Sequence, residues 1–281
     1  MLRGLLLLIL ATFFWGSSFP VIKVVVSEVS SYTYVWVRSA LTAAILAAFV
    51  AATRGRPRRR AVEGGLAAGI AYALGLWLQG WGTALTTATN SAFITGLNVV
   101  FVHLYCAAAM RGYGPSSAAS LAAAVAGLYL LTLPHISLNP GDILVLAGAV
   151  MWAAQVLIVD AYSGEDPPTL AMFEMLPAVA FAAMDYADGG IDYVPPACMA
   201  GIAYLAAACG ALAFSLQVAG QRVVRAHAAA IIYLAEPVFA AVISYVALGE
   251  VLEPVRMLGA ALILLAMAIA SLSEEAWKGQ A

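Results

Sequence analysis

Long apolar runs, separated by short polar segments, follow one another along almost the whole chain. A helix needs about 20 apolar residues to cross the hydrocarbon core of a bilayer. Charges, Pro/Gly clusters and polar stretches divide the chain into ten runs of roughly this kind, and each run predicts a membrane-spanning helix. The runs cover residues 4–22, 31–52, 64–110 (two spans with a turn within 83–90), 112–134, 143–159, 169–184, 196–221, 228–248 and 257–272.

The composition agrees with this pattern. The 281 residues are 64% hydrophobic and 10% charged, with a mean hydropathy of +0.94, whereas soluble domains are about 45–50% apolar and about 25% charged. A water-soluble enzyme, a disordered chain and a nucleic-acid-binding domain are therefore excluded. The runs are continuous and do not alternate, which also excludes a membrane β-barrel. We expect an all-α membrane protein of ten transmembrane helices with no attached globular domain.

Lysine and arginine residues gather in the loops of one predicted side, which faces the cytoplasm in most membrane proteins. With the N-terminus in the cytoplasm, ten cations fall on the inner side and only Lys23 and Arg256 on the outer side. The inner cations are Arg3, Arg54, Arg56, Arg58, Arg59, Arg60, Arg111, Arg222, Arg225 and Lys278. The outer loops carry acids instead, such as Asp185. An even number of spans places the C-terminus in the cytoplasm too, and no nucleic-acid partner is needed to explain the arginines.

The two halves of the chain resemble each other. Offsets of 137 and 138 positions align Trp15 with Trp152, Gln79 with Gln217, Gly82 with Gly220, Asn98 with Glu236 and Phe101 with Phe239. We expect two five-helix repeats, residues 1–138 and 139–275, followed by a short tail, 276–281. Because five is odd, the second repeat must be inverted relative to the first. Inverted repeats are typical of secondary transporters, whose substrate site lies near the midplane between the repeats.

Glu236 lies about 12 Å into the ninth predicted span, close to the bilayer midplane. An ionisable group at that depth is costly and needs a reason. Its repeat mate, Asn98, lies at a similar depth, and Pro237 should kink or loosen the helix beside it. Two interpretations stay open: Glu236 lines a cavity and contacts substrate or carries a proton, or it is a hydrogen-bonded structural residue that holds the kink.

Arg38 lies about seven residues into the second span. It could form a structural or gating ion pair, bind a substrate carboxylate, or extend its long stem to the outer surface. Glu174 starts from the opposite side, so we expect it to be a solvated residue at the inner mouth. Lys23 and Asp160 are expected to be charges at helix ends.

Aromatic and amide side chains recur on single helix faces, a pattern that suits a cavity for a small amphipathic solute, although each of these side chains could instead serve packing. We expect a substrate-binding cavity lined by Trp15, Ser18, Arg38, Tyr72, Gln79, Asn98, Trp152, Gln155, Tyr233 and Glu236. His103 is expected to be a packed or hydrogen-bonded residue, and His135 and His227 are expected in loops. Gly65 and Gly69 form a GxxxG pattern that favours helix packing.

Several motifs that would indicate another activity are absent from the sequence. It contains no GxxxxGK[ST] phosphate loop, no HExxH or GxSxG and no TVGYG-like filter. ATP-driven transport by this chain alone and the enzymes marked by these motifs are therefore not expected. The three cysteines lie in apolar runs without metal-ligand spacing, so neither a metal site nor a disulfide is predicted.

Several segments resemble the EamA family of the drug/metabolite transporter superfamily. The resemblance rests on FWGSSF at 14–19, Arg38, TNSAF at 89–93, Gly141-Asp142 with Trp152-Ala153, and above all EPVFAA at 236–241 with LGAALIL at 258–264. The first half departs from the family pattern, since Val99 stands where a proline is common.

This resemblance implies a ten-helix inverted-repeat carrier without a prosthetic group, working by alternating access. It implies an exporter of small organic metabolites such as amino acids, with proton coupling left open. The short loops and the lack of a targeting segment suit the plasma or inner membrane, and we expect a monomer or a homodimer. The alternative is a non-transporting multi-pass membrane protein, such as an assembly or sensory component.

Overall fold

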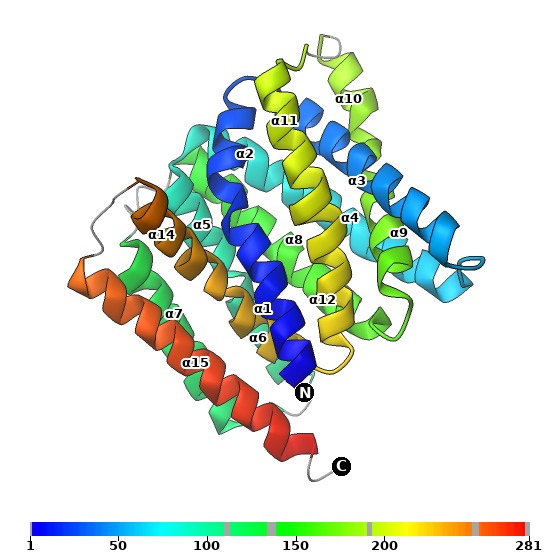
Figure 1. The fold of residues 1–281 in the computed structure, drawn as a ribbon. Coiled ribbons are helices and arrows are strands. Elements are labelled where there is room, and N and C mark those ends of the chain that lie inside the picture. The colour runs from blue at the N-terminus through cyan, green and yellow to red at the C-terminus, as the bar shows by residue number, and fades with distance from the viewer. Residues whose placement is uncertain (1, 110–112, 134–138, 190–192, 249–252, 279–281) are drawn as a thin grey trace.

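The computed structural model describes residues 2–109, 113–133, 139–189, 193–248 and 253–278. Within these residues the chain forms helices and no strand (Figure 1). Nine of the described apolar spans are long enough to cross a membrane. The ninth predicted span, residues 228–248, is divided between α13 (Ala226–Tyr233) and α14 (Ala235–Leu248). The predicted all-α, multi-pass membrane fold is confirmed, while Arg111 and His135 lie outside the described residues.

The predicted spans correspond to the observed helices within a few residues at each end. The first seven elements are α1 (Leu2–Gly16), α2 (Ser18–Val26), α3 (Ser31–Thr53), α4 (Arg59–Leu85), α5 (Ala88–Gly96), α6 (Asn98–Ala108) and α7 (Pro115–Thr132). Those that follow, besides α13 and α14, are α8 (Pro140–Tyr162), α9 (Pro167–Val179), α10 (Phe181–Ala187), α11 (Pro196–Tyr204), a π-helix (Leu205–Leu212), α12 (Ala213–Gln221) and α15 (Pro254–Lys278). Helix α1 begins and α15 ends at the same end of the bundle (Figure 1).

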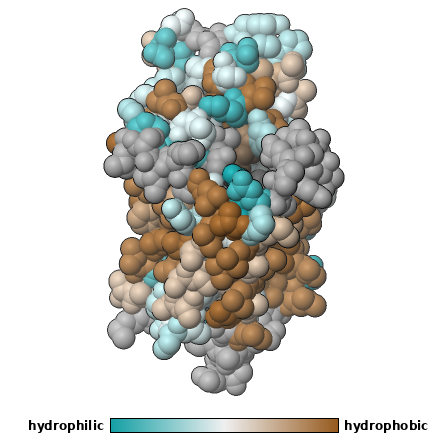
Figure 2. All heavy atoms as spheres, turned by 90° about the vertical axis from the view of Figure 1, so that its left-hand side faces the viewer, coloured by the Kyte–Doolittle hydropathy of each residue, from teal (hydrophilic) through white to brown (hydrophobic). Residues whose placement is uncertain are grey.

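Large apolar side chains cover much of the surface. Ile70, Leu104 and Ile143 are each more than half exposed. Figure 2 shows hydrophobic side chains over the middle of one face of the molecule, with hydrophilic side chains gathered towards its top. Apolar surface of this extent is unfavourable in water but faces acyl chains in a bilayer. The surface therefore fits the membrane environment that the composition predicts.

Two spans are interrupted at corresponding places. Leu97 separates α5 from α6 and Leu234 separates α13 from α14, and each donates its N–H to the carbonyl oxygen three residues earlier, at 3.1 Å, rather than four. Pro237 explains the second break, because it has no N–H to offer the carbonyl of Tyr233. The break at Leu97 has no proline to explain it, since Val99 occupies the place that corresponds to Pro237. Tertiary packing must therefore stabilise the break at Leu97.

Helices α4 and α8 cross at very close range through a pair of glycines. A Cβ atom on Gly82 would lie 2.7 Å from the carbonyl oxygen of Gly141, and a Cβ on Gly141 would lie 2.8 Å from that of Gly82. The predicted packing role of Gly65 and Gly69 is also observed, because added Cβ atoms there would lie within 2.6 Å of carbonyl oxygens of α9. Such small residues let membrane helices approach closely.

A polar cluster joins α3 to α10 at one end of the bundle. Asp185 is 2% exposed and accepts hydrogen bonds from Ser30 Oγ at 2.7 Å, Thr33 Oγ1 at 2.5 Å and Trp36 Nε1 at 2.8 Å. The prediction of an acid in an outer loop was wrong for Asp185, because the residue belongs to α10 and is buried. Its three donors compensate the loss of water around the carboxylate.

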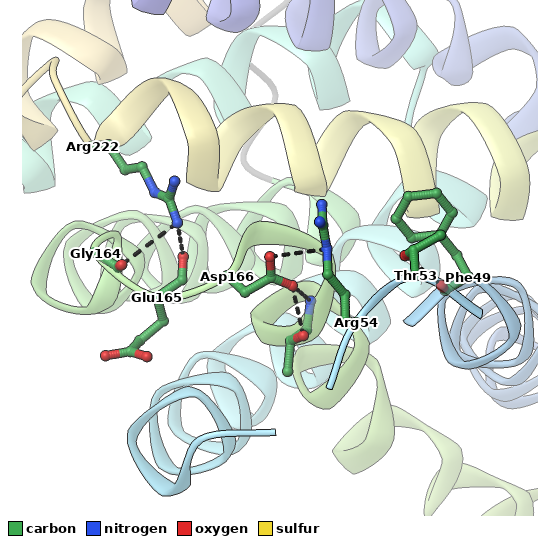
Figure 3. A network of polar contacts seen from close by, with 8 residues as sticks. Phe49, Thr53, Arg54, Gly164, Glu165, Asp166 and Arg222 are labelled. Carbon is green, nitrogen blue, oxygen red and sulfur yellow. Dashed lines mark hydrogen bonds and ion pairs between the residues drawn. The ribbon is translucent and has the colours of Figure 1, made fainter. Parts of the chain in front are cut away.

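A second polar cluster joins α3 to α9 at the other end of the bundle. We call this end the arginine-rich end because it carries Arg54, Arg60 and Arg222. Arg54 Nε lies 3.2 Å from Asp166 Oδ1 (Figure 3). Asp166 also caps α9 by accepting hydrogen bonds from the N–H of Thr169 at 3.2 Å and from its Oγ1 at 2.7 Å. Arg222 donates to the carbonyl oxygens of Ser163, Gly164 and Glu165 at the end of α8. Helix α3 is thus tied to the other half of the chain at both of its ends.

The histidines are packed inside the bundle where the structure describes them. His103 lies near hydrogen-bonding partners on both ring nitrogens, with Tyr113 Oη 3.1 Å from Nδ1 and the carbonyl oxygen of His227 3.1 Å from Nε2. This agrees with the prediction for His103. The prediction for His227 was wrong, since it lies in α13 and is 4% exposed. Neighbouring helices bury the His227 side chain, and this packing is not visible in the local sequence.

Candidate functional site

A cavity lies at the centre of the bundle, between helices of both halves. Its volume of about 70 Å³ is several times the roughly 10–15 Å³ that one buried water needs. Its lining residues are Trp15, Ser18, Ile22, Arg38, Leu76, Gln79, Thr95, Asn98, Trp152, Gln155, Val156, Phe214, Gln217, Tyr233 and Glu236. Polar and aromatic side chains make up most of this wall, so the cavity can hold a polar solute.

Nine of the ten residues singled out in the sequence line this one cavity. The exception is Tyr72, which is fully buried behind the wall. Its ring packs edge-on against the rings of Trp152 and Phe214, with centroid distances of 5.8 and 5.1 Å. Tyr72 therefore supports two lining residues and does not itself line the cavity. The expectation of a lining role for Tyr72 was wrong because helical spacing alone does not separate a lining residue from one behind it.

Most of the lining residues form pairs related by the same offsets that align the two halves. At 137 positions, Trp15 corresponds to Trp152 and Ser18 to Gln155; at 138 positions, Leu76 corresponds to Phe214, Gln79 to Gln217, Thr95 to Tyr233 and Asn98 to Glu236. The cavity thus receives equivalent positions from both halves. Gln217 and Thr95 were not among the predicted residues, yet the offset that pairs them with Gln79 and Tyr233 was a signal that could have found them.

A buried amide network forms one side of the cavity. Gln155 Nε2 donates to Glu174 Oε1 at 2.6 Å, and Gln155 and Gln217 exchange hydrogen bonds of 3.1 Å through their side-chain amides. Glu174 is 0% exposed. The prediction that Glu174 is a solvated residue at the inner mouth was wrong, because α4 packs over it through Gly69, whose added Cβ would lie 2.5 Å from the Glu174 carbonyl oxygen.

On another side of the cavity, Arg38 is 4% exposed and its NH1 donates to Tyr34 Oη at 2.6 Å. Within the described residues no carboxylate lies within 4.0 Å of the guanidinium, and Nε has no hydrogen-bond partner. The interpretation as an ion pair therefore finds no partner in this part of the chain. The burial of the side chain also contradicts an extended stem that reaches the membrane surface.

Glu236 and Asn98 enter the cavity directly after the two helix breaks. Asn98 begins α6 after Leu97, and Glu236 is the second residue of α14 after Leu234. Both side chains are half-buried, and Asn98 Oδ1 has no hydrogen-bond partner in the part of the chain that the structure describes. The carboxyl group of Glu236 makes no hydrogen bond with a described residue. The alternative in which Glu236 is held by a neighbouring helix therefore receives no support from the described contacts.

Trp15 is held in the wall by the π-helix. Its Nε1 donates to the carbonyl oxygen of Cys209 at 3.0 Å, and its ring packs edge-on against Phe214 and Tyr233 with centroid distances of 5.2 and 5.3 Å. π-helical turns release carbonyl groups from the normal helical ladder and often mark functional sites. The corresponding donor of the second half, Trp152 Nε1, is buried and has no partner among the described residues. One indole N–H is thus held by the protein, while the other has no acceptor in that part of the chain.

Comparison with known proteins identifies the group to which this architecture belongs. A family model described as "EamA-like transporter family" matches the chain twice, over residues 2–133 and 139–272. This chain belongs to the EamA-like transporter family. The two matched segments together cover nearly all of the chain, and the resemblance to the family seen in the sequence is confirmed.

Two individual comparisons agree with this membership. An uncharacterized transporter of Archaeoglobus fulgidus is 30% identical over 271 residues, which cover 94% of this chain and 84% of the relative. A solved crystal structure superposes with a TM-score of 0.79 over 98% of each chain at 16% identity, which shows a shared fold. Together these findings describe a multi-pass transporter of the cell membrane, and they point to a transporter rather than an enzyme.

Proposed function

We propose that this EamA-like protein is a secondary transporter that exports small organic metabolites, such as amino acids, by alternating access through the central cavity. The observation that carries this proposal is the wall of the cavity, to which both halves of the chain contribute polar and aromatic side chains at corresponding positions. A site between two halves can be exposed to either side of the membrane when one half rocks against the other. The chain works as a monomer or a homodimer.

The two helix breaks support this mechanism. Asn98 and Glu236 follow Leu97 and Leu234, where the regular hydrogen bonding of two spans is interrupted. Discontinuous helices at the membrane midplane supply backbone and side-chain groups to substrate and coupling ions in transporters. Glu236 is the ionisable lining residue that could carry a proton, while Asn98 at the corresponding place cannot.

Transport in liposomes that contain the purified protein tests the proposal. The liposomes are loaded with a panel of amino acids and related metabolites, and efflux and uptake are measured with and without a pH gradient. We expect flux of at least one solute, reduced by Glu236→Gln and by Asn98→Ala. Flux that responds to the gradient in the wild type but not in Glu236→Gln would assign proton coupling to Glu236. Unchanged flux in both variants would refute the assignment of the site, and no flux of any solute would refute the proposed function.

A further inference from the structure

The most unusual group in the wall of the cavity is the guanidinium of Arg38. An arginine side chain keeps its charge under all ordinary conditions, and its fork presents five N–H donors. Tyr34 Oη accepts one hydrogen bond from NH1, and the guanidinium carbon lies 5.8 Å from the centre of the Tyr34 ring. These contacts are with a neutral partner. They leave the charge uncompensated and Nε without an acceptor.

A buried charge without a counter-charge is strongly unfavourable. Nearly every ionised group that proteins retain in such a position is paired, coordinates a metal or binds a ligand. The described part of the chain provides no carboxylate within 4.0 Å of Arg38, and the side chain borders the cavity. The acid in the same wall, Glu236, makes no ion pair with Arg38, so a close counter-charge is available from a solute that enters the cavity. Planar carboxylates match the guanidinium fork and can accept two parallel hydrogen bonds from it.

The position of Arg38 relative to Glu174 strengthens this reasoning. Both are the eighth residue of their helix, Arg38 in α3 and Glu174 in α9, and they are 136 positions apart. The same offset relates the residues that cap these two helices, Ser30 and Asp166, each of which accepts a hydrogen bond from the backbone N–H three residues later. One half of the chain thus places a cation where the other places an acid.

The two members of this pair differ in their position relative to the cavity. Each makes one hydrogen bond and keeps one buried atom, Arg38 Nε or Glu174 Oε2, without a partner in the described part of the chain. Glu174 lies behind the lining residue Gln155, whereas Arg38 borders the cavity itself. The acid that borders the cavity is Glu236, on α14. The cavity therefore has a cationic group on α3 and an acidic group on α14. A solute with an anionic end and a hydrogen-bond-donating or cationic end would bind in a single orientation.

From these contacts we infer that Arg38 binds the carboxylate of the transported solute, so that the substrates of this protein are carboxylate-bearing metabolites. The inference rests on the proposed transport function for its biological meaning, but binding can be measured without transport. It assigns the side of the guanidinium that borders the cavity to the solute and leaves the NH1–Tyr34 bond in place. The aromatic and amide side chains of the cavity wall contact the rest of the solute and select among carboxylates.

Ligand-induced stabilisation of the full-length protein in detergent tests this inference, because a solute that binds the folded state raises the unfolding temperature. The probes are sets of three solutes with the same side chain: leucine, leucinamide and isoamylamine, and phenylalanine, phenylalaninamide and phenethylamine. We expect a carboxylate to stabilise the wild type and the amide and amine of its set to have little effect. This comparison needs no variant and so does not depend on the folding of a mutant.

Three variants then locate the carboxylate-binding group. Arg38→Gln is expected to weaken binding of the carboxylate at least about tenfold, since a desolvated charge pair is lost. Arg38→Lys should keep part of the binding because it retains the charge but not the fork. Tyr34→Phe is the matched control, because it removes the partner of NH1 and leaves the charge, and it should retain carboxylate selectivity.

The outcomes separate this inference from the proposed function. Equal stabilisation by acid, amide and amine, full binding by Arg38→Gln, or no stabilisation by any carboxylate would overturn the role of Arg38. Flux of amines or amides in liposomes without flux of carboxylates would overturn it too, while leaving the proposed transport function standing. Carboxylate binding that depends on Arg38, in a protein that moves no solute across liposomes, would support the inference and refute transport.

Discussion

Arg54 Nε and Asp166 Oδ1 lie 3.2 Å apart, and this ion pair joins the end of α3 to the start of α9 at the arginine-rich end of the molecule. The side chains are 46% and 36% exposed. The pair faces water, so its attraction is screened. Asp185 joins the opposite end of α3 to α10 through buried contacts. The two ends of this helix are therefore held by interactions of very different strength.

The first prediction concerns the exposed pair. Arg54→Ala should lower the free energy of unfolding by only a few tenths of a kcal/mol, because exposed ion pairs contribute about 0.2–1 kcal/mol. Asp166→Ala should cost about 1 kcal/mol more, because it also removes the cap of α9. Asp166→Asn keeps a capping oxygen and is the control; it should resemble Arg54→Ala. Thermal unfolding in detergent measures all three, and equal effects of Asp166→Ala and Asp166→Asn would contradict the capping role.

The second prediction concerns the buried acid of the opposite end. Asp185→Ala removes the acceptor of Thr33 and Trp36, while Ser30 Oγ can still donate to Thr33 Oγ1 at 3.1 Å. The loss of two hydrogen bonds to a charged group, worth about 1.5–3 kcal/mol each, should cost at least about 3 kcal/mol. Chemical or thermal unfolding of the detergent-solubilised protein measures the change. Asp188→Ala is the control from the same end of the bundle. An effect of Asp185→Ala no larger than that of Asp188→Ala would show that the cluster does not stabilise the fold.

The third prediction concerns the glycine contact between α4 and α8. Gly82→Ala places a Cβ 2.7 Å from the carbonyl oxygen of Gly141 and 2.6 Å from a methyl group of Val145. The helices must move apart, which should cost about 1–3 kcal/mol, the usual range for overpacking. Gly164→Ala is the matched control, because no atom lies within 4 Å of its added Cβ. A melting temperature for Gly82→Ala equal to that of Gly164→Ala would refute this close packing.

The fourth prediction contrasts the two tryptophans of the cavity. Trp15→Phe removes the hydrogen bond to the carbonyl oxygen of Cys209 and should destabilise the protein by about 1–3 kcal/mol, since a buried acceptor is left unpaired. Trp152→Phe removes a donor that has no partner among the described residues, so stability should change much less. If the free Nε1 serves the solute, Trp152→Phe should instead weaken solute binding. Melting curves with and without solute separate the two effects, and a larger loss of intrinsic stability in Trp152→Phe would contradict the assignment.

Much of the cavity could be predicted from one chain because membrane insertion makes every polar residue at depth conspicuous. Trp15, Gln79 and Glu236 stood out against apolar neighbours, and helical spacing placed them on consistent faces. The offset between the halves added information of a different kind, since it pointed from Gln79 to Gln217. Tyr72 shows where this reasoning stops. It satisfies the same periodicity, yet neighbouring rings cover it.

By itself, the sequence determined the approximate extent of the membrane spans, the all-α fold and the family. Unpaired backbone N–H and C=O groups are very costly in lipid, so each span must be a continuous apolar helix, and such runs are visible in the sequence. Tertiary structure alone decided the environment of each charge. It buried Glu174 under α4, brought Asp185 to three donors of α3, and left Arg38 beside the cavity with a neutral partner. These outcomes depend on which helices pack together and how closely, and small residues such as Gly69 and Gly82 set that distance at positions far from the charges in sequence.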